Sequence, residues 1–279
     1  MPKQYALLSL PRSGSTWFWQ QLQWPGRARD CNGEFFNPGT NRRHCANLCT
    51  MFGAHPPYED NAALPSSAAS ARLEDAYHRS WKPAGFQSTK EVWACCKVPF
   101  FAGHFRCAAL VRHRQYTFPG RENREWTDRW YDGLYRSFLH NILFLPVPVC
   151  RLLDRLKRQD CSPVERRVGT HILASYMLLY DCDKYSIPVV RYHCLTRLPQ
   201  DELRDYLIGL NIPGVNAVDL AARVVKTRKT PDFLPSKVWA YKKYNVEPFC
   251  QEFLKLGGGL FEPFLEYLNP AEFCVADGR

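Results

Sequence analysis

The stretch that most constrains the fold is residues 5–22, where a short apolar run passes through a turn into a helix. The run "YALLSL" (5–10) alternates too little for a strand with one exposed face, which indicates a strand buried on both faces of a parallel sheet. Trp17, Phe18 and Leu22 follow at helical spacing, and Pro25-Gly26 ends that helix. A buried strand leading directly into a helix is typical of α/β proteins.

The rest of the chain repeats this alternation. Ser162 lies at a helix N-cap position, with Pro163 at the first helical position and Glu165 in the first turn. We expect further strands at 27–31, 91–98, 106–112 and 187–193, a short connection at 99–105, and helices at 41–53, near 70–80, from 163, at 199–210 and within 236–268. This order predicts an α/β fold with a central parallel β-sheet flanked by helices, and the length of 279 residues predicts one domain, 1–279.

The charge and cysteine content narrow the classes of ligand and compartment. A formal net charge of +10 favours a polyanionic partner, and the scattered Lys and Arg residues favour a defined site over a basic tail. No apolar run approaches the roughly 20 residues of a membrane span, and no secretory signal precedes Tyr5, so we expect a cytoplasmic protein. The twelve Cys contain no CxxC pair, which favours buried reduced thiols, with a metal site near His44, Cys45 and Cys49 as the alternative.

The turn "PRSGST" (11–16) predicts phosphate binding. A helix that starts after a buried strand directs its first backbone N–H groups, and the positive end of its dipole, to one point. Gly14 allows close approach of an anion, Ser13, Ser15 and Thr16 add hydroxyl donors, and Arg12 can bind two oxygens at once. The turn lacks the first Gly and the Lys of a Walker A loop, which disfavours an ATP or GTP hydrolase.

"PRSGSTW" after a strand resembles the 5′-phosphosulfate-binding loop of the sulfotransferases, which use 3′-phosphoadenosine 5′-phosphosulfate (PAPS). Cytosolic members carry Lys where this chain has Arg12, so the chain is more similar to the tyrosylprotein-type and bacterial branches. The resemblance implies a P-loop-like sulfotransferase fold in which residues 12–17 bind PAPS. It also implies that Trp17 packs on the adenine.

A second stretch, "RCAALVRHRQYTFPGR" (106–121), resembles the family's 3′-phosphate-binding motif, with Arg112 at the end of a strand. The family's Ser, eight residues after this Arg, is replaced by Gly120, which leaves Thr117, or a charge from Arg114 or Arg121, to supply the contact. A basic stretch at 224–233 resembles the loop that covers the nucleotide. Its candidate ligands for the 3′-phosphate are Lys226, Arg228 and Lys229.

The resemblance also suggests a general base. The His of the cytosolic KTH-type motif is missing from "CCKVPFF" (95–101), which retains Lys97, and His104 is a poorer substitute. "CNGEFFNP" (31–38) is similar to the stretch that carries the catalytic Glu in tyrosylprotein-type enzymes, and Glu34 matches that residue. The aromatic neighbours of Glu34 would raise the pKa of its carboxyl group. Arg12 and Lys97 would then stabilise charge on the bridging oxygen.

Together these features predict a PAPS-dependent sulfotransferase that modifies a hydroxyl or amine, releases adenosine 3′,5′-bisphosphate and requires no metal. The segment 55–90, which begins rich in Pro, Ser and Ala, is expected to form a variable loop or lid beside a small-molecule or carbohydrate acceptor, with Tyr77, Trp81 and Phe86 in its lining. One alternative is a small-molecule kinase or other phosphotransferase, disfavoured by the missing P-loop Lys. Another is a non-catalytic nucleotide- or nucleic-acid-binding protein, whose basic and aromatic residues at 121–136 are diluted by acidic ones.

Overall fold

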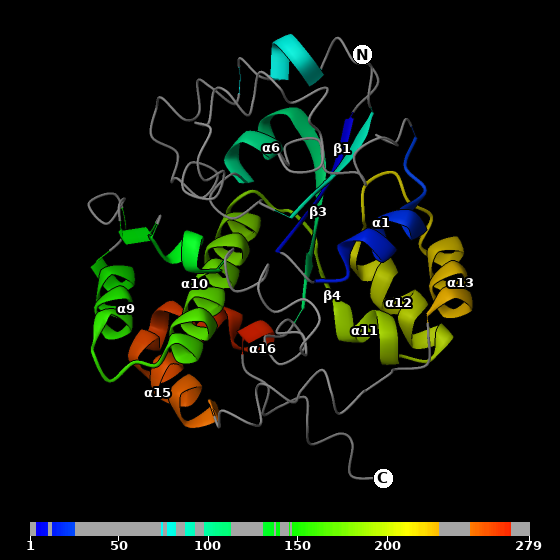
Figure 1. The fold of residues 1–279 in the computed structure, drawn as a ribbon. Coiled ribbons are helices and arrows are strands. Elements are labelled where there is room, and N and C mark those ends of the chain that lie inside the picture. Colours follow the sequence, from blue (N-terminus) through cyan, green and yellow to red (C-terminus); the bar gives the residue numbers. More distant parts are fainter. Residues whose placement is uncertain are drawn as a thin grey trace.

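The architecture is α/β, a central sheet with helices on both faces (Figure 1). The computed structural model describes residues 4–10, 13–25, 74, 77–81, 87–92, 98–112, 131–136, 138–139, 145, 147–228 and 246–268. Among these residues, no helix combines the length and apolar character that crossing a bilayer requires.

The sheet is parallel throughout its described part, as the sequence predicts. Its four described strands lie in the order β2-β1-β3-β4. They are β1 (Gln4–Ser9), β2 (Ser88–Glu91), β3 (Phe105–Val111) and β4 (Val189–Arg191). Ala6, Leu7 and Leu8 are fully buried, which confirms that β1 is covered on both faces.

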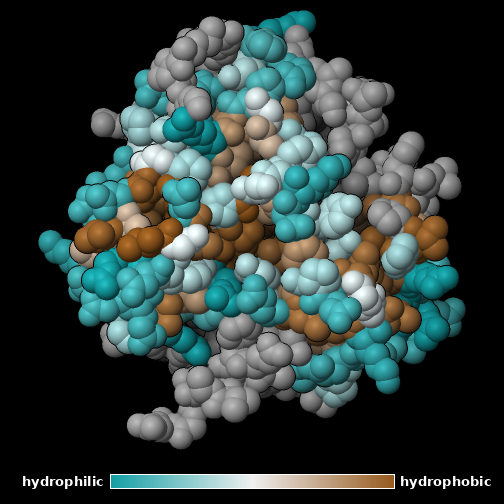
Figure 2. Space-filling view, turned by 180° about the vertical axis from the view of Figure 1, so that it is seen from behind, coloured by the Kyte–Doolittle hydropathy of each residue, from teal (hydrophilic) through white to brown (hydrophobic). Residues whose placement is uncertain are grey.

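The helices form two layers, one on each side of the sheet (Figure 1). The layer that packs on Leu7, Ala108 and Leu110 contains α1 (Ser15–Leu22), α11 (Tyr192–Arg197), α12 (Gln200–Leu210) and α13 (Ala217–Thr227). The layer that packs on the opposite face contains α6 (Val98–His104), α9 (Val147–Lys157), α10 (Pro163–Lys184), α15 (Glu247–Gly257) and α16 (Leu265–Leu268). Three short segments are also described, η2 (Tyr77–Trp81), η5 (Gly258–Leu260) and η6 (Glu262–Phe264), and residues 131–136 and 138–139 are helical. Apolar surface gathers across the middle of the rear face, with hydrophilic residues around it (Figure 2).

The start of α10 confirms the predicted capping box. Ser162 Oγ accepts a hydrogen bond from the Glu165 backbone N–H at 3.3 Å, and the Ser162 N–H donates to Glu165 Oε2 at 2.7 Å. Each of these two helix-end groups is thereby satisfied without water.

The predicted boundaries were wrong at four places. The connection expected at 99–105 is helix α6, which runs directly into β3. The strand expected at 91–98 is β2, shifted to Ser88–Glu91, and the strand expected at 187–193 ends at Arg191, where α11 begins. The basic stretch at 224–233 is helical as far as Thr227. The elements expected at 27–31 and 41–53 lie outside the described residues.

Candidate anion-binding site

The strand order reverses direction between β1 and β3. The chain passes from β1 to β2 on one side of the sheet and then to β3 on the other side of β1. Ligands of open parallel sheets bind at such a reversal, beyond the carboxyl ends of the strands. The "RSGST" turn follows β1, and Arg112 follows β3 at this same edge. The structure therefore brings the two predicted phosphate anchors to neighbouring strand ends.

The N-terminus of α1 is free to bind an anion. Gly14 occupies its N-cap position with φ +84°, and no described side chain caps the helix. The first turn also contains no acidic residue. The first intrahelical bond from this end joins Phe18 N–H to the Gly14 carbonyl at 3.1 Å, so the N–H groups of the preceding residues lack helical acceptors. A helix N-terminus in this state attracts negative charge through both its dipole and its N–H groups.

Ser13, directly before this N-cap, supplies an unused donor. Its side chain is only 2% exposed, and its Oγ has no hydrogen-bond partner among the described residues. A buried hydroxyl without a partner costs about 1–3 kcal/mol, which a bound ligand oxygen can recover. Together with the uncapped helix end, this orphaned hydroxyl fits a phosphate or phosphosulfate group.

Lys90 contributes a positive charge that the sequence analysis did not identify. Its side chain is 1% exposed, and its Nζ donates to Thr16 Oγ1, in the first turn of α1, at 3.0 Å. The next residue, Glu91, is also 1% exposed and accepts a hydrogen bond from Thr89 Oγ1. A buried ammonium group is costly unless it is hydrogen-bonded or near negative charge. The hydrogen bond to Thr16 holds this positive charge beside the first turn of α1.

Tyr192 connects the two anchors. Its ring lies against Gly14 so closely that a Cβ added there would stand 2.3 Å from Tyr192 Cε2. The guanidinium carbon of Arg112 lies over the same ring, 4.5 Å from its centre, and Trp17 makes an edge contact with a centroid separation of 6.1 Å. The ring thus fixes Arg112 relative to the α1 N-terminus through a cation–π contact.

His193 follows Tyr192 and is a neutral imidazole near pH 7. Burial, together with the smaller effect of the positive charges of Arg191 and Arg197, lowers the pKa of His193 to about 4. Cys194 Sγ lies 3.5 Å from His193 Nε2. Arg191 itself is paired with Glu266 Oε2 at 2.8 Å, which anchors α16 to the end of β4.

Of the predicted site residues, the structure describes Ser13 to Trp17, Arg112, Lys226 and Arg228. Lys226 and Arg228 belong to the end of α13 and not to a loop. Arg228 Nη1 donates to the Leu198 carbonyl at 2.6 Å, so this guanidinium stabilises the C-terminal end of α11, about 9 Å along that helix from Tyr192. The other predicted residues, Arg12, Glu34, Lys97, Thr117 and Lys229, lie outside the described residues.

Tyr77, expected in the acceptor lining, and His104, considered as a substitute base, lie at the opposite end of the sheet. Tyr77 donates from its hydroxyl to Gln4 Oε1, at the start of β1, over 2.6 Å. The rings of Tyr77 and His104 pack with a centroid separation of 4.4 Å, and His104 Nε2 lies 2.7 Å from Glu74 Oε1. These contacts support the amino ends of the strands, and they exclude His104 as a base near the α1 N-terminus.

The sequence held signals for the residues that the analysis missed. Tyr192 directly follows the run "IPVVR", so a strand end at Arg191 would have placed it beside Arg112. Lys90 lies in "STKE", whose polar residues do not resemble a buried strand.

Comparison with known proteins identifies no relative: no family model, curated protein or solved structure matches the chain.

Proposed function

We propose that this chain is a sulfotransferase with a P-loop-like sulfotransferase fold, which transfers a sulfuryl group from PAPS to a hydroxyl or amine of a small-molecule or carbohydrate acceptor. The observation that carries the proposal is the uncapped N-terminus of α1, with the unpartnered Ser13 hydroxyl, beside Arg112 at the reversal of strand order. An adenosine with phosphate groups at both its 5′ and 3′ positions matches two cationic anchors on neighbouring strand ends.

In this proposal the site residues bind the phosphate groups, remove the acceptor proton and stabilise the leaving group. The α1 N–H groups, Ser13 and Thr16 bind the 5′-phosphate, while Arg112, held by Tyr192, binds the 3′-phosphate. PAPS supplies an activated sulfuryl group. Glu34 takes the acceptor proton as the acceptor oxygen or nitrogen bonds to sulfur and the bond from sulfur to the bridging oxygen breaks. Arg12, Lys97 and the buried Lys90 stabilise the negative charge that remains on the leaving phosphate.

A ligand comparison tests the nucleotide assignment. Thermal unfolding is measured with adenosine 3′,5′-bisphosphate, ATP and a short RNA, each at the same concentration. The proposal expects the bisphosphate to give the largest increase in Tm, because at equal concentration the ligand that binds the folded state most tightly stabilises it most. A larger increase with ATP would favour a small-molecule kinase, and a larger increase with RNA would favour a nucleic-acid-binding protein.

A substitution tests the chemistry. Glu34→Gln should lower sulfuryl turnover by about 10²-fold, the usual contribution of a general base, while it leaves bisphosphate affinity unchanged. Turnover is followed as transfer of radiolabelled sulfuryl from PAPS into fractions of a cell extract, which also reveals the acceptor. Full activity in the Gln variant would remove Glu34 from the mechanism.

A further inference from the structure

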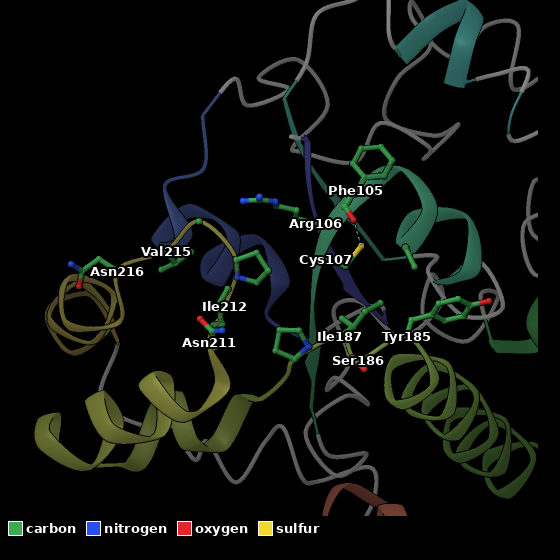
Figure 3. Close-up of a pocket in the computed structure, with 14 residues that line it drawn as sticks. Phe105, Arg106, Cys107, Tyr185, Ser186, Ile187, Asn211, Ile212, Val215 and Asn216 are labelled. Carbon is green, nitrogen blue, oxygen red and sulfur yellow. Dashed lines mark hydrogen bonds between the residues drawn. The ribbon is translucent and has the colours of Figure 1, made fainter. Parts of the chain in front are cut away.

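A cavity lies at the end of the sheet where the strands begin, away from the candidate anion-binding site. Its volume is about 750 Å³, within the range of about 300–1,000 Å³ that is usual for small-molecule sites. It is formed by the start of β3, by the turn between α10 and β4, and by the loop between α12 and α13 (Figure 3). The anion-binding turn follows the carboxyl end of β1, so the two sites lie at opposite edges of the sheet.

The floor of this cavity is the start of β3, which pairs with β1 on one side and has no described strand beside it on the β4 side. The first described residue of β4 in the sheet, Val189, pairs with Ala109, whereas β1 pairs with β3 from Phe105 onward. The Ala109 N–H points toward β4, because it donates to the Pro188 carbonyl at 2.9 Å. Backbone groups of a strand alternate between its two sides, so the N–H and carbonyl of Cys107 also point that way, into the cavity. No described residue accepts a hydrogen bond from this N–H, which leaves it for a bound group.

The lining combines neutral polar groups and apolar side chains with one cation. Ile187, Pro188, Ile212 and Val215 supply apolar walls, and none of the described lining residues is acidic. Arg106 is exposed, and no described carboxylate pairs with it. Its side chain extends from β3 toward the loop that carries Val215 (Figure 3). Burial raises the pKa of the Cys107 thiol to about 12, so this thiol adds no negative charge near pH 7.

From this combination we propose that the cavity binds an amphipathic organic anion, with an apolar or aromatic body among the apolar walls and a carboxylate, sulfate or phosphate group on Arg106. The guanidinium provides a planar pair of donors that matches two oxygens of such a group. The Cys107 N–H provides a further donor. A neutral molecule of the same shape would gain the apolar contacts but not the charge pairing.

The test uses naphthalene-2-sulfonate as the probe and 2-naphthol as its uncharged counterpart, with the full chain. Binding is followed by two-dimensional NMR at the amides of Cys107, Ile187 and Ile212. The sulfonate should shift these amides with micromolar to millimolar affinity, and saturating adenosine 3′,5′-bisphosphate should not displace it. Arg106→Gln should weaken sulfonate binding about tenfold or more, because a hydrogen-bonded charge pair is lost, and should leave 2-naphthol binding unchanged.

The matched control is Arg151→Gln, which removes an exposed arginine from α9. It should leave binding of both probes as in the parent chain. Arg106→Lys should give an intermediate affinity for the sulfonate, since it keeps the charge and loses the paired donors. The proposal is overturned if the sulfonate does not bind at millimolar concentration, if it shifts amides of the α1 N-terminus instead, or if Arg106→Gln binds it as tightly as the parent chain.

Discussion

At the scale of single residues, replacing Ser13 distinguishes a binding role of its hydroxyl from a structural role. Because this buried group has no described partner, Ser13→Ala should leave the free energy of unfolding unchanged or raise it by up to about 1 kcal/mol. The same change should weaken adenosine 3′,5′-bisphosphate binding about tenfold, since a donor to a charged oxygen is lost. Denaturant unfolding and titration calorimetry measure the two effects.

Ser175 provides the control for this pair of measurements. It is similarly buried, but its Oγ lies 3.5 Å from His171 Nε2 within α10. Ser175→Ala should therefore lower stability, by roughly 1 kcal/mol, without changing bisphosphate affinity. If Ser13→Ala behaved in the same way, the Ser13 hydroxyl would be structural and not part of an anion site.

Gly14 is required for two independent reasons. Its φ of +84° disfavours any residue with a side chain, and a Cβ there would overlap the Tyr192 ring. Gly14→Ala should lower the free energy of unfolding by about 1–3 kcal/mol and displace Tyr192 from Arg112.

Gly209 provides the control, because it lies on an exposed part of α12 and a Cβ added there would meet no atom within 4 Å. Gly209→Ala should stabilise the chain by about 0.5–1 kcal/mol. Thermal unfolding compares both variants, and equal effects would contradict the role assigned to Gly14.

At the scale of elements, sequence patterns predicted the parts whose structure is determined by residues close together in the chain. The apolar run of β1 and the capping box of α10 lie where the sequence indicated. The pattern failed at β2, because the strand "STKE" is polar and becomes buried only through partners distant in sequence, such as Thr16 for Lys90. It failed also at α6, since "VPFFAGH" is too short to show helical periodicity.

The same contrast holds within the candidate site. The turn after β1 could be identified as a candidate site because its donors are contiguous in sequence. Lys90, on β2, and Tyr192, at the start of α11, reach this turn from other elements. Their positions depend on the order β2-β1-β3-β4, which no local pattern encodes. Arg228 shows the opposite error. It was predicted to bind the 3′-phosphate because it lies in a basic stretch, whereas its guanidinium donates to the Leu198 carbonyl at the end of α11.

The junction of β4 and α11 gives a pH dependence. The folded pKa of His193 is lowered to about 4, whereas an unfolded histidine titrates near 6.5. Between these values the unfolded state binds more protons, so this residue's contribution is fully present above about pH 6.5 and is lost as the pH falls toward 4. Between pH 7 and pH 4 the free energy of unfolding should therefore fall in both proteins. The fall should be about 1–2 kcal/mol smaller in His193→Gln than in the parent chain, a figure that includes solvent screening of this partly exposed ring.

Asp181 acts in the opposite direction over the same range. Burial raises the pKa of its carboxyl group to about 6, and the positive charge of Lys184 offsets part of this rise. The folded state then holds a proton that the unfolded state releases, so this residue destabilises the fold as the pH rises from about 4 to 6. Denaturant unfolding of His193→Gln and Asp181→Asn across pH 4–7 should give difference curves of opposite slope. Slopes of the same sign would contradict one of the two assignments.

At the scale of the whole molecule, the two proposals place two kinds of anion recognition at opposite ends of the strands. At the carboxyl ends, the uncapped N-terminus of α1 and the buried Ser13 hydroxyl offer donors suited to a compact, highly charged group. At the amino ends, a cavity with a mixed polar and apolar lining offers one exposed guanidinium. A formal net charge of +10 is consistent with negatively charged ligands at both places.

The net charge predicts how adenosine 3′,5′-bisphosphate reaches its site. A field of this sign concentrates anions near the surface and raises association rates at low salt. Three exposed cations, Lys157, Arg158 and Lys255, lie on or just after α9 and on α15, in the layer opposite to α1. Replacing all three by Glu changes the formal charge by six, from +10 to +4. Stopped-flow binding at low salt should show a several-fold slower association with an unchanged dissociation rate, because no contact to the ligand is altered.

Salt and an uncharged ligand complete this test. Raising the salt to about 1 M shortens the screening length to about 3 Å, so the association rates of the parent and the triple variant should converge there. Adenosine, which carries no phosphate, should associate equally fast with both proteins at every salt concentration. A slower association that persisted at high salt, or that affected adenosine too, would mean that the three substitutions had altered the site itself and not the field around it.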